Sequence, residues 1–264
     1  MPERPFKMKK LIASVLGLVM FLAATEGHAM DELRVMISGG FSQAYHDALP
    51  EFERTTGIAV TTLSGSSQGT GPKTIKYQLE NGADVDVVIL SKEGLDELVA
   101  MGRIVDGSEA GLAASPLGAA VRQGSPKPDI SNEAALKQAL LNSRLVAMPG
   151  STSGLFVKDE VFPKFGIADK VHFKIFARGS ESTAALAAGE VDLAIGPLSE
   201  LVGQPGVDVI GPFPASVQLV QIFTAAMVKT SHRMEQARRL IAFLASNATE
   251  AAIKKSGMDP VNHR

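Results

Sequence analysis

The chain has 264 residues, of which 45% are apolar and 20% charged, and its formal net charge at pH 7 is −2. These values are typical of an ordinary globular protein and exclude a disordered chain or a coiled coil. Lysine and arginine are scattered along the sequence, so no nucleic-acid partner is expected. Cysteine is absent, which excludes disulfide bonds and a cysteine-linked lipid anchor.

The first 29 residues have the layout of a secretory signal peptide. A basic segment, KMKK (7–10), precedes the apolar run LIASVLGLVMFLAA (11–24), and TEGHA (25–29) ends in small residues suited to cleavage. The alternative is a retained anchor, but about 14 apolar residues are fewer than the roughly 20 that span a bilayer. We therefore expect residues 1–29 to be a signal peptide cleaved after about Ala29, and the protein to act in the periplasm.

Strand-like and helical patterns then alternate. The expected strands of the first block cover residues 33–39, 58–65 and 85–91, and the helices cover 42–57, with a kink at Pro50, 72–82 and 92–102. Apolar, β-branched strands that alternate with helices are typical of an α/β fold with a largely parallel sheet.

A second block follows a segment rich in proline, glycine and serine (113–131). It predicts helices at 132–143, 154–166 and 181–190 and strands at 144–150, 171–179 and 191–197. A long apolar run (217–228) and one final helix (234–255) complete the chain. Two blocks indicate two lobes, with crossovers near 115–122 and 216–226. We expect the first lobe to comprise residues 30–118 and 223–264, and the second lobe residues 119–222.

Small polar residues gather where the expected strands lead into helices. Each of the five joints contains serine and glycine: 38–42, 64–71, 91–94, 149–154 and 178–182. Ligands of open α/β sheets bind beyond the carboxyl ends of the strands, and helix N-termini attract anions there. Any single serine could simply cap its helix. Five such joints in two lobes favour an anion-binding cleft.

No metal site and no cofactor are expected. The five histidines are isolated in the sequence, and cysteine is absent. GTGPKT (69–74) lacks the order and spacing of a phosphate-binding loop, because Pro72 separates Gly71 from Lys73.

Several segments resemble the type 2 periplasmic binding proteins and, within that fold, the molybdate-binding-protein-like family. The resemblance extends over nearly the whole mature chain, and its most specific segments are FERTTGIAV, GSSQGTG, ENGADVDVVILSKEGLDELVAMGRI, PGSTSG, LAAGEVDLAIGPLSEL and AIKKSGMDP. It implies two lobes, joined by two crossover strands, that close over a small anion. It also implies a monomer, and an ABC permease as partner if the protein is a transport receptor.

One segment departs from the pattern of the molybdate binders. They usually carry a ligand-contacting tyrosine in a Y-x-T-D-A-like stretch, where this chain has GPLSEL (196–201). The departure indicates a different ligand, and the cationic side chains near the joints would suit carboxylates. The chain also resembles the periplasmic aconitate isomerases, which are similar to this same family. These enzymes interconvert trans- and cis-aconitate by a 1,3-proton shift.

Two main hypotheses follow for the function, and a signalling sensor with a partner receptor is a weaker third. In the first, the protein is an aconitate isomerase; in the second, it is a non-catalytic receptor that delivers molybdate, tungstate or a small organic carboxylate to an importer. The substrate-binding candidates are Ser38, Gly39, Ser66, Ser67, Gln68, Thr70, Ser91, Arg122, Ser151, Thr152, Ser153 and Arg178. The candidates for the catalytic base are Lys73, Lys92 and His46, followed by Tyr77 and Glu93.

Overall fold

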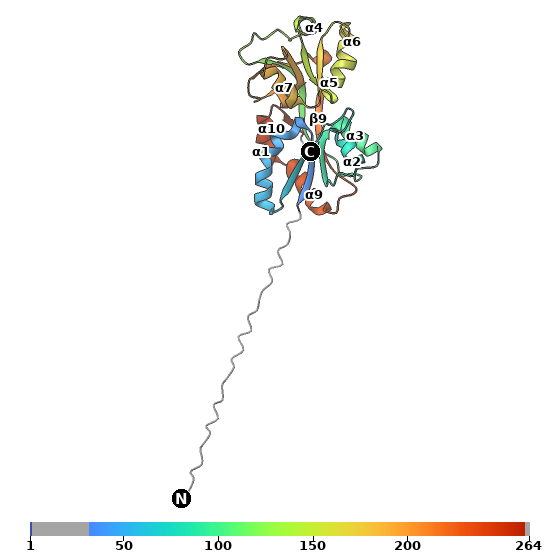
Figure 1. Ribbon diagram of the computed structural model, residues 1–264, viewed down its shortest axis with the longest axis vertical. Helices are drawn as coiled ribbons and strands as arrows, with labels where there is room; N and C mark the ends of the chain where they lie inside the picture. Colours follow the sequence, from blue (N-terminus) through green and yellow to red (C-terminus); the bar gives the residue numbers. More distant parts are fainter. Residues whose placement is uncertain (2–31, 262–264) are drawn as a thin grey trace.

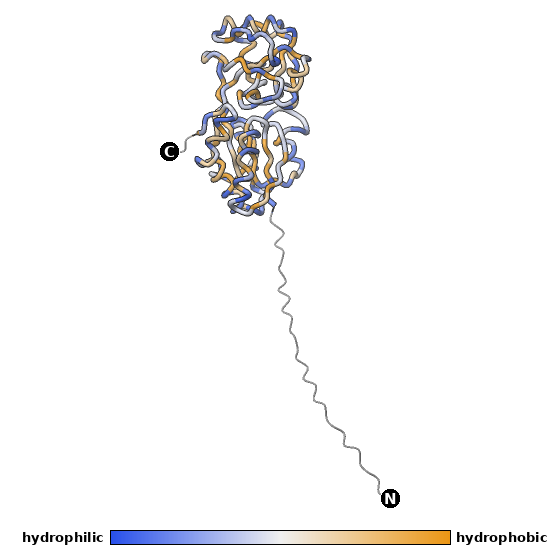
Figure 2. The backbone as a smooth tube through the Cα atoms, turned by 90° about the vertical axis from the view of Figure 1, so that its left-hand side faces the viewer, coloured by the Kyte–Doolittle hydropathy of each residue, from blue (hydrophilic) through white to orange (hydrophobic). Residues whose placement is uncertain are grey.

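The computed structural model describes Met1 and residues 32–261. The expected signal peptide therefore lies, apart from Met1, outside the described residues. Figure 1 shows two lobes, one above the other, and Figure 2 shows the narrow waist between them. In Figure 1 the upper lobe carries α4, α5, α6 and α7, and the lower lobe carries α1, α2, α3, α9 and α10.

The chain forms the first lobe, then the second, and then returns to the first. The first lobe begins with β1 (Leu33–Ile37), α1 (Gly39–Thr56), β2 (Val60–Ser64), α2 (Ile75–Glu80), β3 (Val87–Ser91) and α3 (Lys92–Ala100). After β4 (Ala110–Arg122), the second lobe contains α4 (Glu133–Asn142), β5 (Val146–Pro149), α5 (Thr152–Phe156), η1 (Val157–Val161), α6 (Phe162–Phe165), β6 (Phe173–Phe176), α7 (Gly179–Ala187), β7 (Leu193–Pro197), α8 (Leu198–Leu201) and β8 (Val207–Pro212). The return consists of η2 (Ala215–Val217), β9 (Val220–Met227), α9 (Met234–Leu244), η3 (Asn247–Thr249), α10 (Glu250–Lys255) and β10 (Asp259–Pro260).

Strand order confirms the two-lobe α/β architecture. The order is β2-β1-β3-β9-β4-β7-β5-β6, with β8 and β10 also paired to β4. β1 is parallel to β2 and β3, and β5 is parallel to β6 and β7, whereas β9 is antiparallel to β3. β4 is antiparallel to β9 over Ala110–Pro116 and to β7 over Leu117–Ala120. The long strand β4 therefore extends from the sheet of one lobe into the sheet of the other.

Each sheet is buried on both faces. In β3, Val87 and Ile89 belong to one apolar cluster and Val88 and Leu90 to another on the opposite face. In the second lobe, Leu193 and Ala194 of β7 are divided between two clusters in the same way. Successive strand residues point to opposite faces, so continuous apolar runs are suited to a sheet covered by helices on both sides.

Three expectations from the sequence differ from the structure. The crossover expected near 115–122 is part of a longer strand, since β4 begins at Ala110 and Pro116 pairs with Val220 in the sheet. β8 lies between the expected strand 191–197 and the apolar run 217–228, where the sequence predicts no strand. The single helix expected over 234–255 ends at Leu244, because the Ser246 hydroxyl accepts a hydrogen bond from the Ala248 N–H (3.3 Å) and begins a short 3-10 turn.

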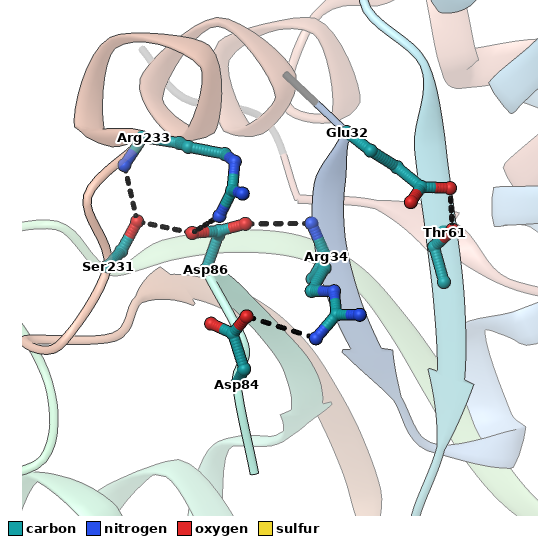
Figure 3. A network of polar contacts seen from close by, with 7 residues as sticks. All are labelled: Glu32, Arg34, Thr61, Asp84, Asp86, Ser231 and Arg233. Carbon is teal, nitrogen blue, oxygen red and sulfur yellow. Dashed lines mark hydrogen bonds and ion pairs between the residues drawn. The ribbon is translucent and has the colours of Figure 1, made fainter. Parts of the chain in front are cut away.

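A buried carboxylate joins the strands at the end of the first sheet where β1 and β3 begin (Figure 3). Asp86, fully buried, accepts hydrogen bonds from the Arg34 N–H (2.8 Å) and the Ser231 hydroxyl (2.6 Å). Arg233 lies 3.5 Å from the same carboxylate. Because Ser231 and Arg233 follow β9, this network fixes the return segment against β1 and β3.

No helix among residues 32–261 is both long enough and apolar enough to cross a membrane.

Candidate functional site

Two adjoining cavities lie between the lobes. The first has a volume of about 30 Å³ and the second a volume of about 200 Å³. The polar residues that line the first cavity are Ser38, Ser66, Ser67, Ser151, Ser153, Arg178, Glu200 and Gln221. The second shares Ser38, Arg178 and Glu200 with the first and adds Ser42, Gln43, His46, Ser64, Ser180, Ser199 and Gln204.

Two helices with uncapped N-termini meet at these cavities. α1 follows Ser38 in the first lobe and α7 follows Arg178 in the second, and neither of these residues caps its helix with its side chain. By contrast, the side chains of Thr74 and Ser91 cap α2 and α3. The first backbone N–H groups of α1 and α7 therefore remain available to an anion, which the helix dipole also favours.

Several buried polar atoms at the cavities have no hydrogen-bond partner among the described residues. They are the Ser38 hydroxyl, the Arg178 Nε and the Gln221 Oε1 at the first cavity, and the Ser199 hydroxyl at the second. A buried polar group without a partner costs about 1–3 kcal/mol, so such groups are usually rare. Their concentration here indicates that a polar ligand completes the site.

The lobes are in direct contact around the cavities. The Ser66 hydroxyl donates to the Ala177 carbonyl (2.7 Å), and the Arg178 guanidinium donates to the Ser64 carbonyl (3.4 Å). Ser91 and Thr152 share a buried hydrogen bond of 2.8 Å. These contacts enclose the space between the lobes, which strengthens electrostatic interactions within it.

One carboxyl group, that of Glu200, lies inside this enclosure. A Cβ atom added to Gly39 would lie 2.4 Å from Oε1 of Glu200, and one added to Gly179 would lie 1.8 Å from Oε2. Glu200 as a whole retains some solvent exposure, but burial of its carboxyl raises the pKa of that group to about 7. The carboxyl thus lies against the first residues of both α1 and α7.

The sequence matches the model of the family described as bacterial extracellular solute-binding proteins over residues 33–259. The chain belongs to this family. It is 36% identical over 230 residues to an aconitate isomerase of Pseudomonas sp., and the match covers 87% of this chain and 88% of the relative.

Solved structures of other binding proteins share the fold of this solute-binding protein. The periplasmic molybdate-binding protein of Azotobacter vinelandii superposes with a TM-score of 0.69 at 21% identity, covering 88% of this chain and 100% of the other. The sulfate-binding protein of Mycobacterium tuberculosis gives 0.68 at 18% identity, covering 88% and 87%. The expected two-lobe fold of the periplasmic binding proteins is thereby confirmed.

The structure brings about half of the candidate residues of this solute-binding protein to the cavities. Those that line the first cavity are Ser38, Gly39, Ser66, Ser67, Ser151, Ser153 and Arg178. His46, on α1, lines the second.

The two candidate lysines lie outside both cavities. Lys73 pairs with Glu181 across the lobes at 3.0 Å, with 57% of its side chain exposed. Lys92 pairs with Asp96 at 2.8 Å on the surface of α3, and this hydrogen bond raises the pKa of Lys92. A raised pKa is the opposite of what a lysine base needs near neutral pH.

Other candidates have structural partners or lie elsewhere. Ser91 caps α3 and contacts Thr152, and the Gln68 amide donates to Glu97 (2.7 Å). Thr70 is exposed and lines neither cavity. Arg122 ends β4 and lines a separate depression of the second lobe. Tyr77 and Glu93 also line neither of the two cavities.

Sequence reasoning missed Glu200 and Gln221. Glu200 belongs to GPLSEL, the segment that departs from the molybdate binders, and a charged residue just beyond a strand end was an available signal. Gln221 interrupts the apolar run of β9, where an inward-facing amide is unusual.

Residues 32–261 contain no group of three or more histidine, aspartate or glutamate side chains arranged to hold a metal ion.

Proposed function

We propose that this protein is an exported aconitate isomerase. The observation that carries the proposal is the 36% identity to the Pseudomonas aconitate isomerase over most of both chains. The cleft supports it, because the chemistry of the cavities suits a small polyanion. Serine hydroxyls, two helix N-termini and one arginine converge on the first cavity.

These donors match the demands of an allylic proton shift. Removal of a proton from the methylene carbon next to the double bond of aconitate places negative charge on the conjugated carboxylate. Hydrogen-bond donors aimed at that carboxylate stabilise the charged intermediate, and the enclosed cleft strengthens their effect. The guanidinium of Arg178 can hold a second carboxylate, since its planar donors fit the two oxygens. Proton transfer of this kind needs no redox or group-transfer cofactor.

The remaining parts of the proposal concern the setting of the reaction. We propose that residues 1–29 direct export and are removed after about Ala29, and that the mature protein acts in the periplasm. Membership of an extracellular solute-binding family supports export. We further propose that the mature protein is a monomer whose ligand is a tricarboxylate.

A second function is favoured by the family itself. A non-catalytic receptor would bind molybdate, tungstate or an organic carboxylate between the same lobes and present it to an ABC permease. The fold shared with molybdate- and sulfate-binding proteins supports this alternative.

Proton NMR of the purified protein with trans-aconitate distinguishes the two functions. We expect cis-aconitate to appear and the mixture to approach the same composition from either isomer. An unchanged spectrum after hours, together with an increase in melting temperature on adding molybdate or tungstate, would establish the receptor instead.

A further inference from the structure

The position of Glu200 places one carboxyl group at the junction of the two lobes. Glu200 belongs to the short helix α8, which begins immediately after β7 ends at Pro197. α8 packs against β4, the strand shared by both lobes, and against α1 and α7. The side chain extends to Gly39 and Gly179, the first residues of the two uncapped helices. A carboxylate of the substrate held by either helix would therefore lie beside Glu200.

Glu200 is chemically distinct from its neighbours in the site. It is the only carboxyl group that lines either cavity among the described residues, and it makes no hydrogen bond or ion pair with any of them. The guanidinium of Arg178 offers hydrogen-bond donors only and cannot serve as the base. His46 is the other group able to transfer a proton, and it lines only the second cavity.

Building on the proposed isomerase function, we propose that Glu200 is the single group that both removes and returns the proton. Its carboxylate takes a proton from the methylene carbon of aconitate, so that this C–H bond breaks and an O–H bond forms. The electron pair of this C–H bond forms a new double bond between the former methylene carbon and the central carbon, and the electrons of the original double bond move through the former vinylic carbon into its carboxylate. The Glu200 O–H then delivers the proton to the former vinylic carbon, which forms a new C–H bond and restores the carboxylate.

The environment of Glu200 suits both halves of this cycle. Burial raises the pKa of the carboxyl to about 7, so the group can accept and release a proton near neutral pH. The charged and titratable groups that face it across the cavities are Arg178 at the start of α7 and His46 on α1. Because the base must be ionised, we expect kcat/KM to decrease tenfold per pH unit below the pKa of Glu200.

The first test compares Glu200→Gln with the exposed carboxylate control Glu160→Gln. We expect E200Q to bind trans-aconitate, measured by calorimetry, but to lose turnover by about a thousandfold, as removal of a general base does. We expect E160Q to match the wild type. Turnover of E200Q within tenfold of the wild type would overturn the proposal.

A second test asks whether one group or two transfer the proton. Each isomer is incubated separately in D₂O, and deuterium is followed in the methylene group of the unreacted substrate and in the product. With a single group, E200Q loses exchange from both isomers, whereas His46→Gln retains it from both at a rate within about tenfold. If E200Q lost exchange from one isomer only, a second base would be present and the proposal would be wrong.

The wild-type result separates the two proposals. If the wild type interconverts the isomers, and part of the product keeps the proton of the substrate while the rest takes up deuterium, one group carries the proton, as proposed for Glu200. If the wild type does not interconvert them at all, the isomerase function itself fails. If the wild type is active and E200Q remains active, only the role of Glu200 fails.

Discussion

Gly179 and Glu200 are in such close contact that a Cβ atom on Gly179 would lie 1.8 Å from Oε2 of Glu200. Gly39 stands in a similar relation to Oε1 of the same carboxyl, at 2.4 Å. Real Cβ atoms do not approach other atoms this closely, so even a methyl group would displace the carboxyl. Two glycines from different lobes thus keep space for one side chain.

We expect Gly179→Ala to reduce turnover at least a hundredfold while the protein remains folded. Alanine is compatible with the first position of a helix, so α7 itself should still form. The cost is the displacement of Glu200, because misplacing a reacting group by about 1 Å can reduce a rate a hundredfold. Steady-state kinetics and thermal unfolding of the same preparation check this. Full activity in G179A would show that the position of the carboxyl is unimportant.

Ser38→Ala should weaken ligand binding without affecting folding. The Ser38 hydroxyl is buried and has no partner among the described residues, so no protein contact is lost with it. A hydrogen bond to a charged ligand contributes about 1.5–3 kcal/mol, which corresponds to a loss of affinity for trans-aconitate of about tenfold to a hundredfold. Calorimetric titration measures the affinity, and thermal unfolding should give an unchanged Tm.

Ser91→Ala provides the matched comparison. Ser91 lines neither cavity but caps α3 and shares a hydrogen bond with Thr152. Loss of the cap costs about 1 kcal/mol, so S91A should lower the Tm. If S38A lowered the Tm and S91A did not, Ser38 would be the residue that stabilises the fold, and its assignment as a ligand contact would be wrong.

Glu200→Gln should stabilise the ligand-free protein at high pH and not at low pH. The pKa of this carboxyl is raised from its ordinary 4.5 to about 7, so between these values the folded state holds a proton that the unfolded state has released. The wild type therefore loses stability as pH rises through this window. At about 1.4 kcal/mol per pKa unit, the loss of stability has an upper bound of about 3–4 kcal/mol, which the partial exposure of Glu200 reduces.

Urea unfolding of the wild type and E200Q at pH 4 and pH 8 checks this expectation. E200Q should be the more stable protein at pH 8, and the difference should shrink at pH 4, where both states of the wild type bind the proton. A difference independent of pH would mean that the glutamine acts through packing and not through charge.

Asp86→Ala should destabilise the protein by about 3–5 kcal/mol, since it leaves Arg233 and other buried donors without their carboxylate. Asp84→Ala is the matched control, because the Asp84–Arg34 pair is 63% and 40% exposed and should contribute less than about 1 kcal/mol. Chemical unfolding measures both. Since Asp86 immediately precedes β3 and the cleft lies beyond the carboxyl ends of the strands, kcat of folded D86A should stay near that of the wild type.

Local sequence patterns were sufficient for much of the fold. The apolar runs of β1 and β3 predicted buried strands, because alternate residues of such runs can fill both faces of a covered sheet. The final helix was wrong for a local reason: the polar side chain of Ser246 competes for backbone groups and ends α9. The extent of β4 was missed because its pairing with β9 and β7 involves distant segments, which override the preference of Pro116 and its neighbours.

For the site, the sequence alone determined the serine- and glycine-rich joints between strands and helices. Their anion-binding character follows from their positions at strand ends. The joints and their positions depend only on residues that are close together in the chain. Only the tertiary structure decided which side chains meet there. Lys73 and Lys92 lie near the joints in sequence but pair with Glu181 and Asp96 outside the cavities. Glu200 enters the cleft because α8, α1 and α7 converge from distant segments. Its pKa is likewise raised by burial, which exists only in the folded protein.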